Sequence, residues 1–150
     1  MRTRLSTMAG GGDGIVGRWP HIRRYLRVDE TGWVEHDMHC WHVAAKRLGL
    51  PCAKVAAACE EWADFFEWRL AQRAEELAGD RLTRHLVAEW TAEMAYCSRR
   101  CAAFARGEDP GEPVPLRVRR PDLYAEGQAV VDEIMAGVDA RRGPAGAATA

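Results

Sequence analysis

The chain has almost no lysine and no long apolar segment. Lys46 and Lys54 are the only lysines among its 21 basic residues, so arginine carries nearly all of the positive charge. A run of about 18 apolar residues, which a membrane-spanning helix needs, does not occur, and the N-terminus has no apolar stretch typical of a signal peptide. We therefore expect a cytoplasmic protein without membrane attachment.

The chain also lacks the short motifs that accompany common enzyme chemistries. It has no nucleophile elbow, phosphate-binding loop, dinucleotide fingerprint or HExxH motif. His85 and Glu89 are four residues apart, but the paired Glu-x-x-His pattern of di-iron proteins is missing, and His85 is expected at the surface or its boundary. We predict a protein that is not an enzyme and that needs no cofactor.

The five cysteines do not form an even set, which disfavours a disulfide framework in a chain without an export signal. Reduced thiols, either buried in the core or bound to a metal, are the expected state. The cysteines are Cys40, Cys52, Cys59, Cys97 and Cys101.

The length of 150 residues and the hydrophobic fraction of 47% fit one compact domain. Apolar residues at three- and four-residue steps predict an all-α, four-helix bundle-like domain over residues 18–142, after a flexible basic N-terminus (1–17) and before a frayed C-terminal tail (143–150). The predicted helices are 33–48, 51–78, 80–105 and 122–140, with a surface loop over 106–121. The segment RYLRVDETGWV alternates around a DETG turn, which also permits a short β-hairpin there.

The second and third predicted helices form a helical hairpin, because only a short turn separates them. The larger apolar residues of these two helices predict the centre of the core: Trp62, Phe66, Leu86, Trp90 and Met94. Phe65 and Trp68 point away from the stripe of Trp62 and Phe66. This second apolar face needs a cover, which is the fourth helix, the N-terminal arm or another subunit.

Charge is segregated along the chain. Residues 1–28 carry a net charge of +5 from six arginines and one aspartate, and residues 29–80 carry −6 from eleven acids and five bases. The arm either folds back on the acidic helices or reaches an anionic partner. Its arginines flank Trp19 and Tyr25, a pattern that suits nucleic acid or an acidic protein. The candidate contact residues are Arg18, Arg23, Arg24, Arg27 and Lys54.

The segment HDMHCWH is rich in residues that bind metals. On a helix, His36 and Cys40 share a face, as do Cys97 and Cys101 in the third helix, so the four could form a closed zinc site. His39 and His42 share a face with charged residues and would form a weaker, open site. The alternative is that the cysteines are core residues and the histidines are solvated.

The segment from Trp41 to Trp62 resembles the helix-turn-helix superfamily, with Ala45, Gly49, Leu50 and Val55 at the matching offsets. The positions that would read bases are Cys52, Ala53, Lys54, Ala56 and Ala57, which offer few hydrogen-bonding groups. We therefore expect no sequence-specific DNA binding by the isolated domain. An ordinary helix-loop-helix joint is the alternative.

Three functions are consistent with these patterns. The first is a small intracellular interaction or regulatory protein that acts through protein-protein contacts, with another protein or a second copy of itself as partner and with Phe65 and Trp68 facing it. The second is a helix-turn-helix-like DNA-binding regulator. The third is a zinc-binding structural or sensor protein.

Overall fold

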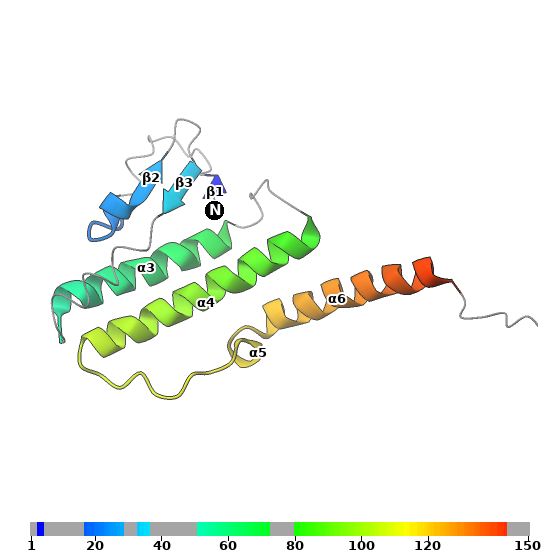
Figure 1. The fold of residues 1–150 in the computed structure, drawn as a ribbon. Helices are drawn as coiled ribbons and strands as arrows, with labels where there is room; N and C mark the ends of the chain where they lie inside the picture. Colours follow the sequence, from blue (N-terminus) through cyan, green and yellow to red (C-terminus); the bar gives the residue numbers. More distant parts are fainter. Residues whose placement is uncertain (1–2, 5–16, 29–32, 37–50, 73–79, 144–150) are drawn as a thin grey trace, which may run out of the picture.

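The fold is predominantly helical, as predicted, with a small antiparallel sheet beside the helices (Figure 1). The computed structural model describes residues 3–4, 17–28, 33–36, 51–72 and 80–143. None of the helices in these ranges is long and apolar enough to cross a membrane. The elements in chain order are β1 (Thr3–Arg4), the 3-10 turn η1 (Arg23–Tyr25), β2 (Leu26–Val28), β3 (Trp33–His36), α3 (Ala53–Ala71), α4 (Arg81–Ala105), α5 (Leu116–Arg119) and α6 (Pro121–Arg142).

The sheet has the strand order β1-β3-β2, and both pairs are antiparallel. Leu26 pairs with His36 and Val28 with Val34, so β2 and β3 are the two antiparallel strands of the short hairpin that the sequence permitted. The predicted helix is therefore wrong over Trp33–His36, where cross-strand pairing outweighs the helical spacing of the apolar residues. The remainder of that helix, residues 37–48, lies outside the described residues. Thr3–Arg4 pairs with β3, so the predicted flexible N-terminus is wrong at these two residues.

Helices α3 and α4 lie side by side and antiparallel, and they form the centre of the molecule (Figure 1). Helix α4 begins where predicted, because the carboxylate of Asp80 accepts a hydrogen bond from the Thr83 backbone N–H at 2.8 Å. Its buried face consists mainly of small residues: Ala88, Thr91, Ala92, Ala95, Ser98, Ala102 and Ala105, together with His85. This small-residue face lets the two backbones approach closely.

The larger apolar residues of α4 consequently face outward. Leu86 is 54% exposed and Trp90 is 43% exposed, so their predicted place in the core is wrong, whereas Met94 is half-buried. Trp62 and Phe66 of α3 are fully buried, as predicted. The core is therefore built from large residues of α3 packed against small residues of α4.

The N-terminal arm covers the second apolar face of α3. Trp19 is buried and meets the ring of Phe65 edge to face at 5.3 Å and that of Trp68 at 5.6 Å. Ile22 and Leu26 are buried in the same cluster. Phe65 is completely buried and Trp68 half-buried, so the prediction that these two residues face a partner protein is wrong.

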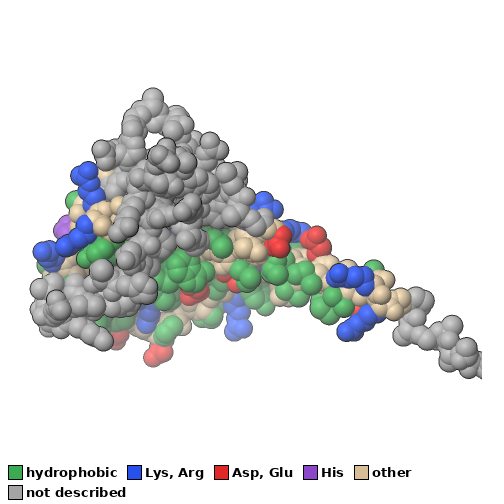
Figure 2. Space-filling view, turned by 45° about the horizontal axis from the view of Figure 1, so that its top comes forward, with side chains coloured by type: hydrophobic (Ala, Val, Ile, Leu, Met, Phe, Trp, Pro, Cys, Tyr) green, Lys and Arg blue, Asp and Glu red, His purple; other side chains and the backbone are tan. Residues whose placement is uncertain are grey.

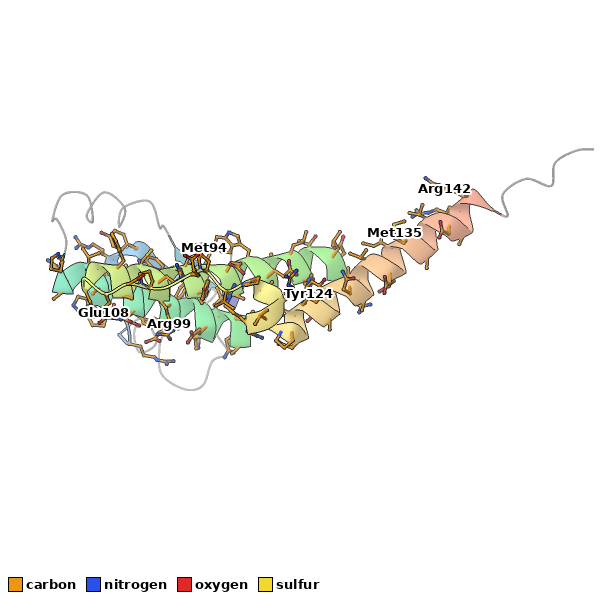
Figure 3. All side chains as sticks on the ribbon, turned by 90° about the horizontal axis from the view of Figure 1, so that it is seen from below. Met94, Arg99, Glu108, Tyr124, Met135 and Arg142 are labelled. Atoms are coloured by element: carbon orange, nitrogen blue, oxygen red, sulfur yellow. The ribbon has the colours of Figure 1, made fainter. Side chains whose placement is uncertain are left out.

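Helix α6 packs on α4 mainly through its first half, and beyond that half Glu133 forms an ion pair with Arg81 at the start of α4. Leu123 and Val130 are buried, whereas Ile134 and Met135 are exposed. Figure 3 shows the helix continuing past the N-terminal end of α4, with Met135 and Arg142 beyond the packed pair. A four-helix bundle is therefore not confirmed. The predicted surface loop 106–121 contains the single turn of α5.

Candidate interaction surface

The basic arm is folded back on acidic α3. The carboxylate of Glu61 accepts hydrogen bonds from the backbone N–H groups of His21 (2.7 Å) and Ile22 (3.0 Å), and its other oxygen lies 2.6 Å from Nδ1 of His21. The guanidinium groups of Arg18 and Arg24 lie over the rings of Trp19 and Tyr25. The fold-back prediction is thus confirmed over the described residues of the arm.

The candidate contact residues of the basic arm lie mainly at the surface. Arg18, Arg23 and Arg24 are exposed, and Lys54 is exposed in the first turn of α3. Arg27 lies in β2. The structure therefore presents these arginines on a segment that is already anchored by its own aromatic side chains.

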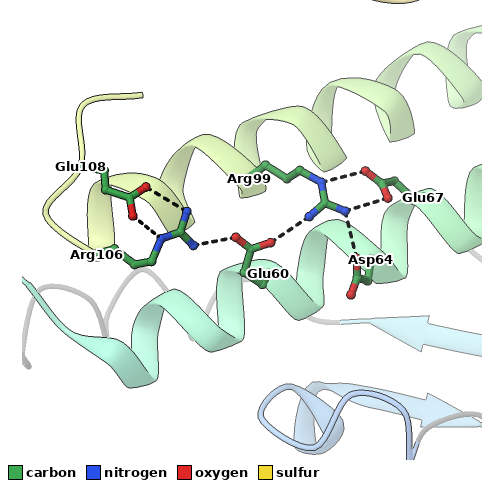
Figure 4. Close-up of polar contacts among 6 residues, drawn as sticks. All are labelled: Glu60, Asp64, Glu67, Arg99, Arg106 and Glu108. Carbon is green, nitrogen blue, oxygen red and sulfur yellow. Dashed lines mark hydrogen bonds and ion pairs between the residues drawn. The ribbon is translucent and has the colours of Figure 1, made fainter. Parts of the chain in front are cut away.

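The acidic edge of α3 is neutralised by two arginines of the α4 segment (Figure 4). Arg99 contacts three carboxylates, those of Glu60 (2.8 Å), Asp64 (2.9 Å) and Glu67 (2.8 Å). Arg106 bridges Glu60 and Glu108. These hydrogen bonds raise the pKa of both arginines further. The acids of α3 therefore hold the helical pair together and are not a vacant site for a cationic ligand.

Three of the four candidate zinc ligands, His36, Cys97 and Cys101, lie within the described residues. His36 lies in strand β3, so the prediction that it shares a helix face with Cys40 is wrong. Cys40 itself lies outside the described residues. Cys97 is exposed and Cys101 half-buried. No group of three or more histidine, cysteine or acidic residues is arranged for metal binding within the described ranges. The zinc site stays a prediction.

Cys59 behaves as a core residue. It is buried between α3 and α4 with Val55, Ala56, Ala102 and Ala105. Burial raises the pKa of its thiol to about 12, and the neighbouring Cys101 and Glu60 add to the effect. A thiol in this state is unreactive at neutral pH.

Only part of the helix-turn-helix-like segment can be placed, because residues 37–50 lie outside the described ranges. Ala53 and Lys54 are exposed, but Ala56 is buried against α4 and Cys52 is half-buried. The Cys52 backbone N–H donates to the Ala105 carbonyl at 2.8 Å. The start of α3 is thereby tied to the end of α4. Both the DNA-binding alternative and the expectation that the isolated domain reads no specific sequence stay predictions.

His85 was expected at the surface and is instead 3% exposed. Its Nε2 lies 2.8 Å from a carboxylate oxygen of Glu89, and its Nδ1 lies 3.6 Å from Glu126 of α6. Gly127 of α6 packs over the ring. The sequence did carry a signal for this contact, because a glycine in mid-helix on the face of Leu123 and Val130 marks a close approach.

The loop after α4 is fixed to that helix by side chains. Arg100 donates to the carbonyls of Pro110 (3.0 Å) and Gly111 (2.7 Å), and the Val114 backbone N–H donates to the Tyr96 hydroxyl at 2.7 Å. The guanidinium of Arg119 lies 3.6 Å from the centre of the Tyr96 ring. These contacts hold the start of α6 against α4.

The outer face of α4 carries a row of exposed apolar side chains. Trp90 touches Phe66 at one edge, with ring centres 5.9 Å apart, but remains 43% exposed. Hydrophobic side chains follow the molecule from the helical pair toward the projecting end of α6 (Figure 2). We call this face the α4 stripe, and it consists of Leu82, Leu86, Trp90, Cys97 and Phe104.

A groove opens at one end of the α4 stripe. Leu82 lies on one side of it, and Val130 and Ile134 of α6 lie on the other. Charged side chains of Asp80, Arg81, Glu133 and Arg141 also line this groove, so the stripe is the more apolar of the two surfaces. No protein-family model matches this chain, and neither a curated protein nor a solved structure matches it.

Proposed function

We propose that this chain is a non-enzymatic intracellular interaction protein, and that the α4 stripe binds an amphipathic helix of a partner protein. The observation that carries the proposal is the inverted pattern of α4, whose small residues face the core and whose large apolar residues face solvent. Leu86 is 54% and Phe104 59% exposed. This partner surface replaces the predicted one at Phe65 and Trp68.

The dimensions of the stripe suit a helical ligand. From Leu82 to Phe104 it extends over about six turns, or about 33 Å at 1.5 Å per residue. Burying a large apolar side chain contributes about 1.5 to 3 kcal/mol, so a helix that covered the stripe would gain several such contributions. Helix-in-groove recognition uses anchors at this kind of spacing.

The charged residues beside the stripe are already engaged. Arg119 pairs with Glu93, and Arg100 holds the carbonyls of the following loop. The stripe therefore selects its ligand by apolar contact more than by charge. The cysteines that the structure describes are free thiols, which supports an intracellular setting. The DNA and zinc alternatives lack a comparable supporting observation.

Site-specific photo-crosslinking in the native cell would test this proposal. A photoreactive phenylalanine derivative at Leu86 should yield a discrete covalent adduct with a protein partner, and Phe104→Glu in the same chain should abolish the adduct. The same derivative at Arg84, which is exposed on the same helix outside the stripe, is the control. Equal labelling from both positions, or no adduct from Leu86, contradicts the proposal.

A further inference from the structure

The contact between α4 and α6 is built around a buried imidazole. His85 is the only histidine of these two helices, and it is almost completely buried. The buried part of α6 consists of only two apolar side chains, Leu123 and Val130. Histidine ordinarily changes its charge between about pH 5 and pH 8. Because so little apolar surface holds α6, the state of this one ring contributes a large share of the contact.

A carboxylate faces each nitrogen of the His85 ring. Nε2 lies 2.8 Å from Glu89 of α4, and Nδ1 lies 3.6 Å from Glu126 of α6. The first contact is a hydrogen bond, whereas Nδ1 is buried and has no hydrogen-bond partner among the described residues. A neutral imidazole has one N–H group and donates to one carboxylate, and a protonated imidazole has two and can donate to both. The carboxylate that gains from the second N–H group belongs to α6.

We propose that His85 is a pH-sensitive switch: protonation of its ring fastens α6 to α4, and deprotonation loosens this contact. In the neutral form the ring donates from Nε2 to Glu89 and turns an unprotonated Nδ1 toward the Glu126 carboxylate. In the protonated form Nδ1–H donates to Glu126, and a charge-assisted hydrogen bond joins the two helices. A contact that binds a proton is stabilised as the pH falls and weakened as it rises. The switch acts at a contact other than the α4 stripe and goes beyond the proposed partner binding.

The close approach of the two helices keeps the ring beside Glu126. A Cβ atom at position 127 would lie 2.5 Å from Nε2 of His85 and 3.2 Å from a carboxylate oxygen of Glu89, so only glycine lets the α6 backbone rest against the ring. Glycine weakens the interior of a helix, and here it permits the contact that brings the neighbouring Glu126 to Nδ1. The second N–H group of a protonated ring is therefore directed at α6.

The other charged groups of this region keep their charge near neutral pH. Two ion pairs accompany the imidazole, Arg81 with Glu133 and Arg119 with Glu93. Helix α3, which also packs on α4, contributes the buried guanidinium of Arg69. Arginine and carboxylate side chains ordinarily titrate far from neutral pH. A change in the contact over the neutral range is therefore assigned to the imidazole.

The switch determines which apolar surface this end of the molecule presents. The groove beside the α4 stripe needs a docked α6, because Leu82 of α4 forms one side and Val130 and Ile134 of α6 form the other. Protonation keeps this groove formed. Deprotonation loosens α6 and exposes Leu123 and Val130, which are buried against the rest of the molecule.

Distances between two spin labels in the full chain would test the switch at about pH 6 and about pH 8. Unnatural amino acids that carry the labels would replace Ala71 of α3 and Ala140 of α6, which are both exposed. We expect one narrow distance distribution at the lower pH and an added, longer and broader population at the higher pH. A hydrogen bond to a charged group suffices to change the ratio of docked to released helix by about tenfold. Identical distributions at both pH values, or release at the lower pH, overturn the proposal.

Two glutamine substitutions on α6 separate the switch from other contributions to docking. Glu126→Gln removes the negative charge beside Nδ1, so the pH dependence of the distances should disappear. Glu133→Gln is the matched control, because it removes the same charge from the same helix and breaks the pair with Arg81. In this control the distances should still change with pH. A pH response that survives in Glu126→Gln, or that is lost equally in both variants, contradicts the role of His85.

Nuclear magnetic resonance of the imidazole would report the protonation of His85 directly. Its ring resonances, assigned through the bonded backbone atoms, should move between the two pH values in step with the change in distance. Ring resonances that stay unchanged over this range overturn the proposal even if the helices move. Photo-crosslinking at Leu86 tests the α4 stripe independently of this contact, so the two proposals fail separately.

Discussion

Gly127 of α6 lies directly against the buried imidazole of His85 in α4. A Cβ atom at position 127 would lie 2.5 Å from the Nε2 atom of His85, closer than side chains tolerate. The ring has little freedom to move away, because Nε2 is also 2.8 Å from Glu89. The missing side chain at position 127 therefore sets how closely α6 approaches α4.

Replacing Gly127 with alanine should destabilise the protein. Alanine normally stabilises a helix by about 0.5 to 1 kcal/mol relative to glycine, but overpacking a buried contact costs about 1 to 3 kcal/mol, so we expect a net loss. Gly137→Ala is the control, because its Cβ would meet only the end of the Arg141 side chain at 4.0 Å. Urea unfolding measures both. Stabilisation by both substitutions would show that α6 does not rest on His85.

The sequence patterns predicted the helices well and the packing faces less well. The bounds of α4 and α6 agree with the apolar periodicity. The inner face of α4 was missed because alanine, serine and threonine carry a weak hydrophobic signal, although small residues are what a close helix pair requires. Leu86 and Trp90 were assigned to the core for the same reason.

The strand Trp33–His36 shows a second limit of the patterns. Its apolar residues also fit a helical repeat, and the choice depends on pairing with residues that lie elsewhere in the chain. The sequence likewise left three candidates to cover Phe65 and Trp68: the fourth helix, the N-terminal arm or another subunit. Periodicity shows that an apolar face must be covered, but it does not identify the segment that covers it. Trp19 and Ile22 supply this cover.

Two tryptophans should differ strongly in their effect on stability. Trp19→Ala removes a side chain that is only 2% exposed, and the cost should be about 3 to 5 kcal/mol, as for other buried aromatic residues. Trp90→Ala should cost less, about 1 to 2 kcal/mol, because 43% of that residue already meets solvent. Denaturant unfolding measures the difference. Equal losses would place Trp90 in the core and remove it from the α4 stripe.

Removing Arg99 should destabilise the helical pair in a salt-dependent way. Its guanidinium meets the carboxylates of Glu60, Asp64 and Glu67 on α3, and Arg99→Ala would leave them to repel one another. Since the network is solvent-exposed, we expect a loss of about 1 kcal/mol. Added salt should shrink the difference.

Urea is the suitable denaturant for this comparison because it does not screen charge. Arg84→Ala is the matched control, since Arg84 is exposed on the same helix outside the network. A loss at Arg99 that persists unchanged in high salt would mean that the side chain acts by packing and not by charge.

Thiol reactivity should separate Cys97 from Cys59. Cys97 is exposed on the α4 stripe, whereas Cys59 is buried with a pKa raised to about 12. Because the thiolate is the reactive form, Cys59 should stay unmodified at pH 8 until the protein unfolds. Rapidly reacting thiols of the native protein can be counted with a chromogenic disulfide reagent. Compared with the wild type, Cys97→Ser should have one such thiol fewer, and Cys59→Ser should have the same number. Both variants should show one thiol fewer than the wild type after unfolding. Rapid modification of Cys59 in the native state would contradict this prediction and would mean that the contact between α3 and α4 opens readily. A partner bound to the α4 stripe should slow the reaction of Cys97 and leave that of Cys59 unchanged.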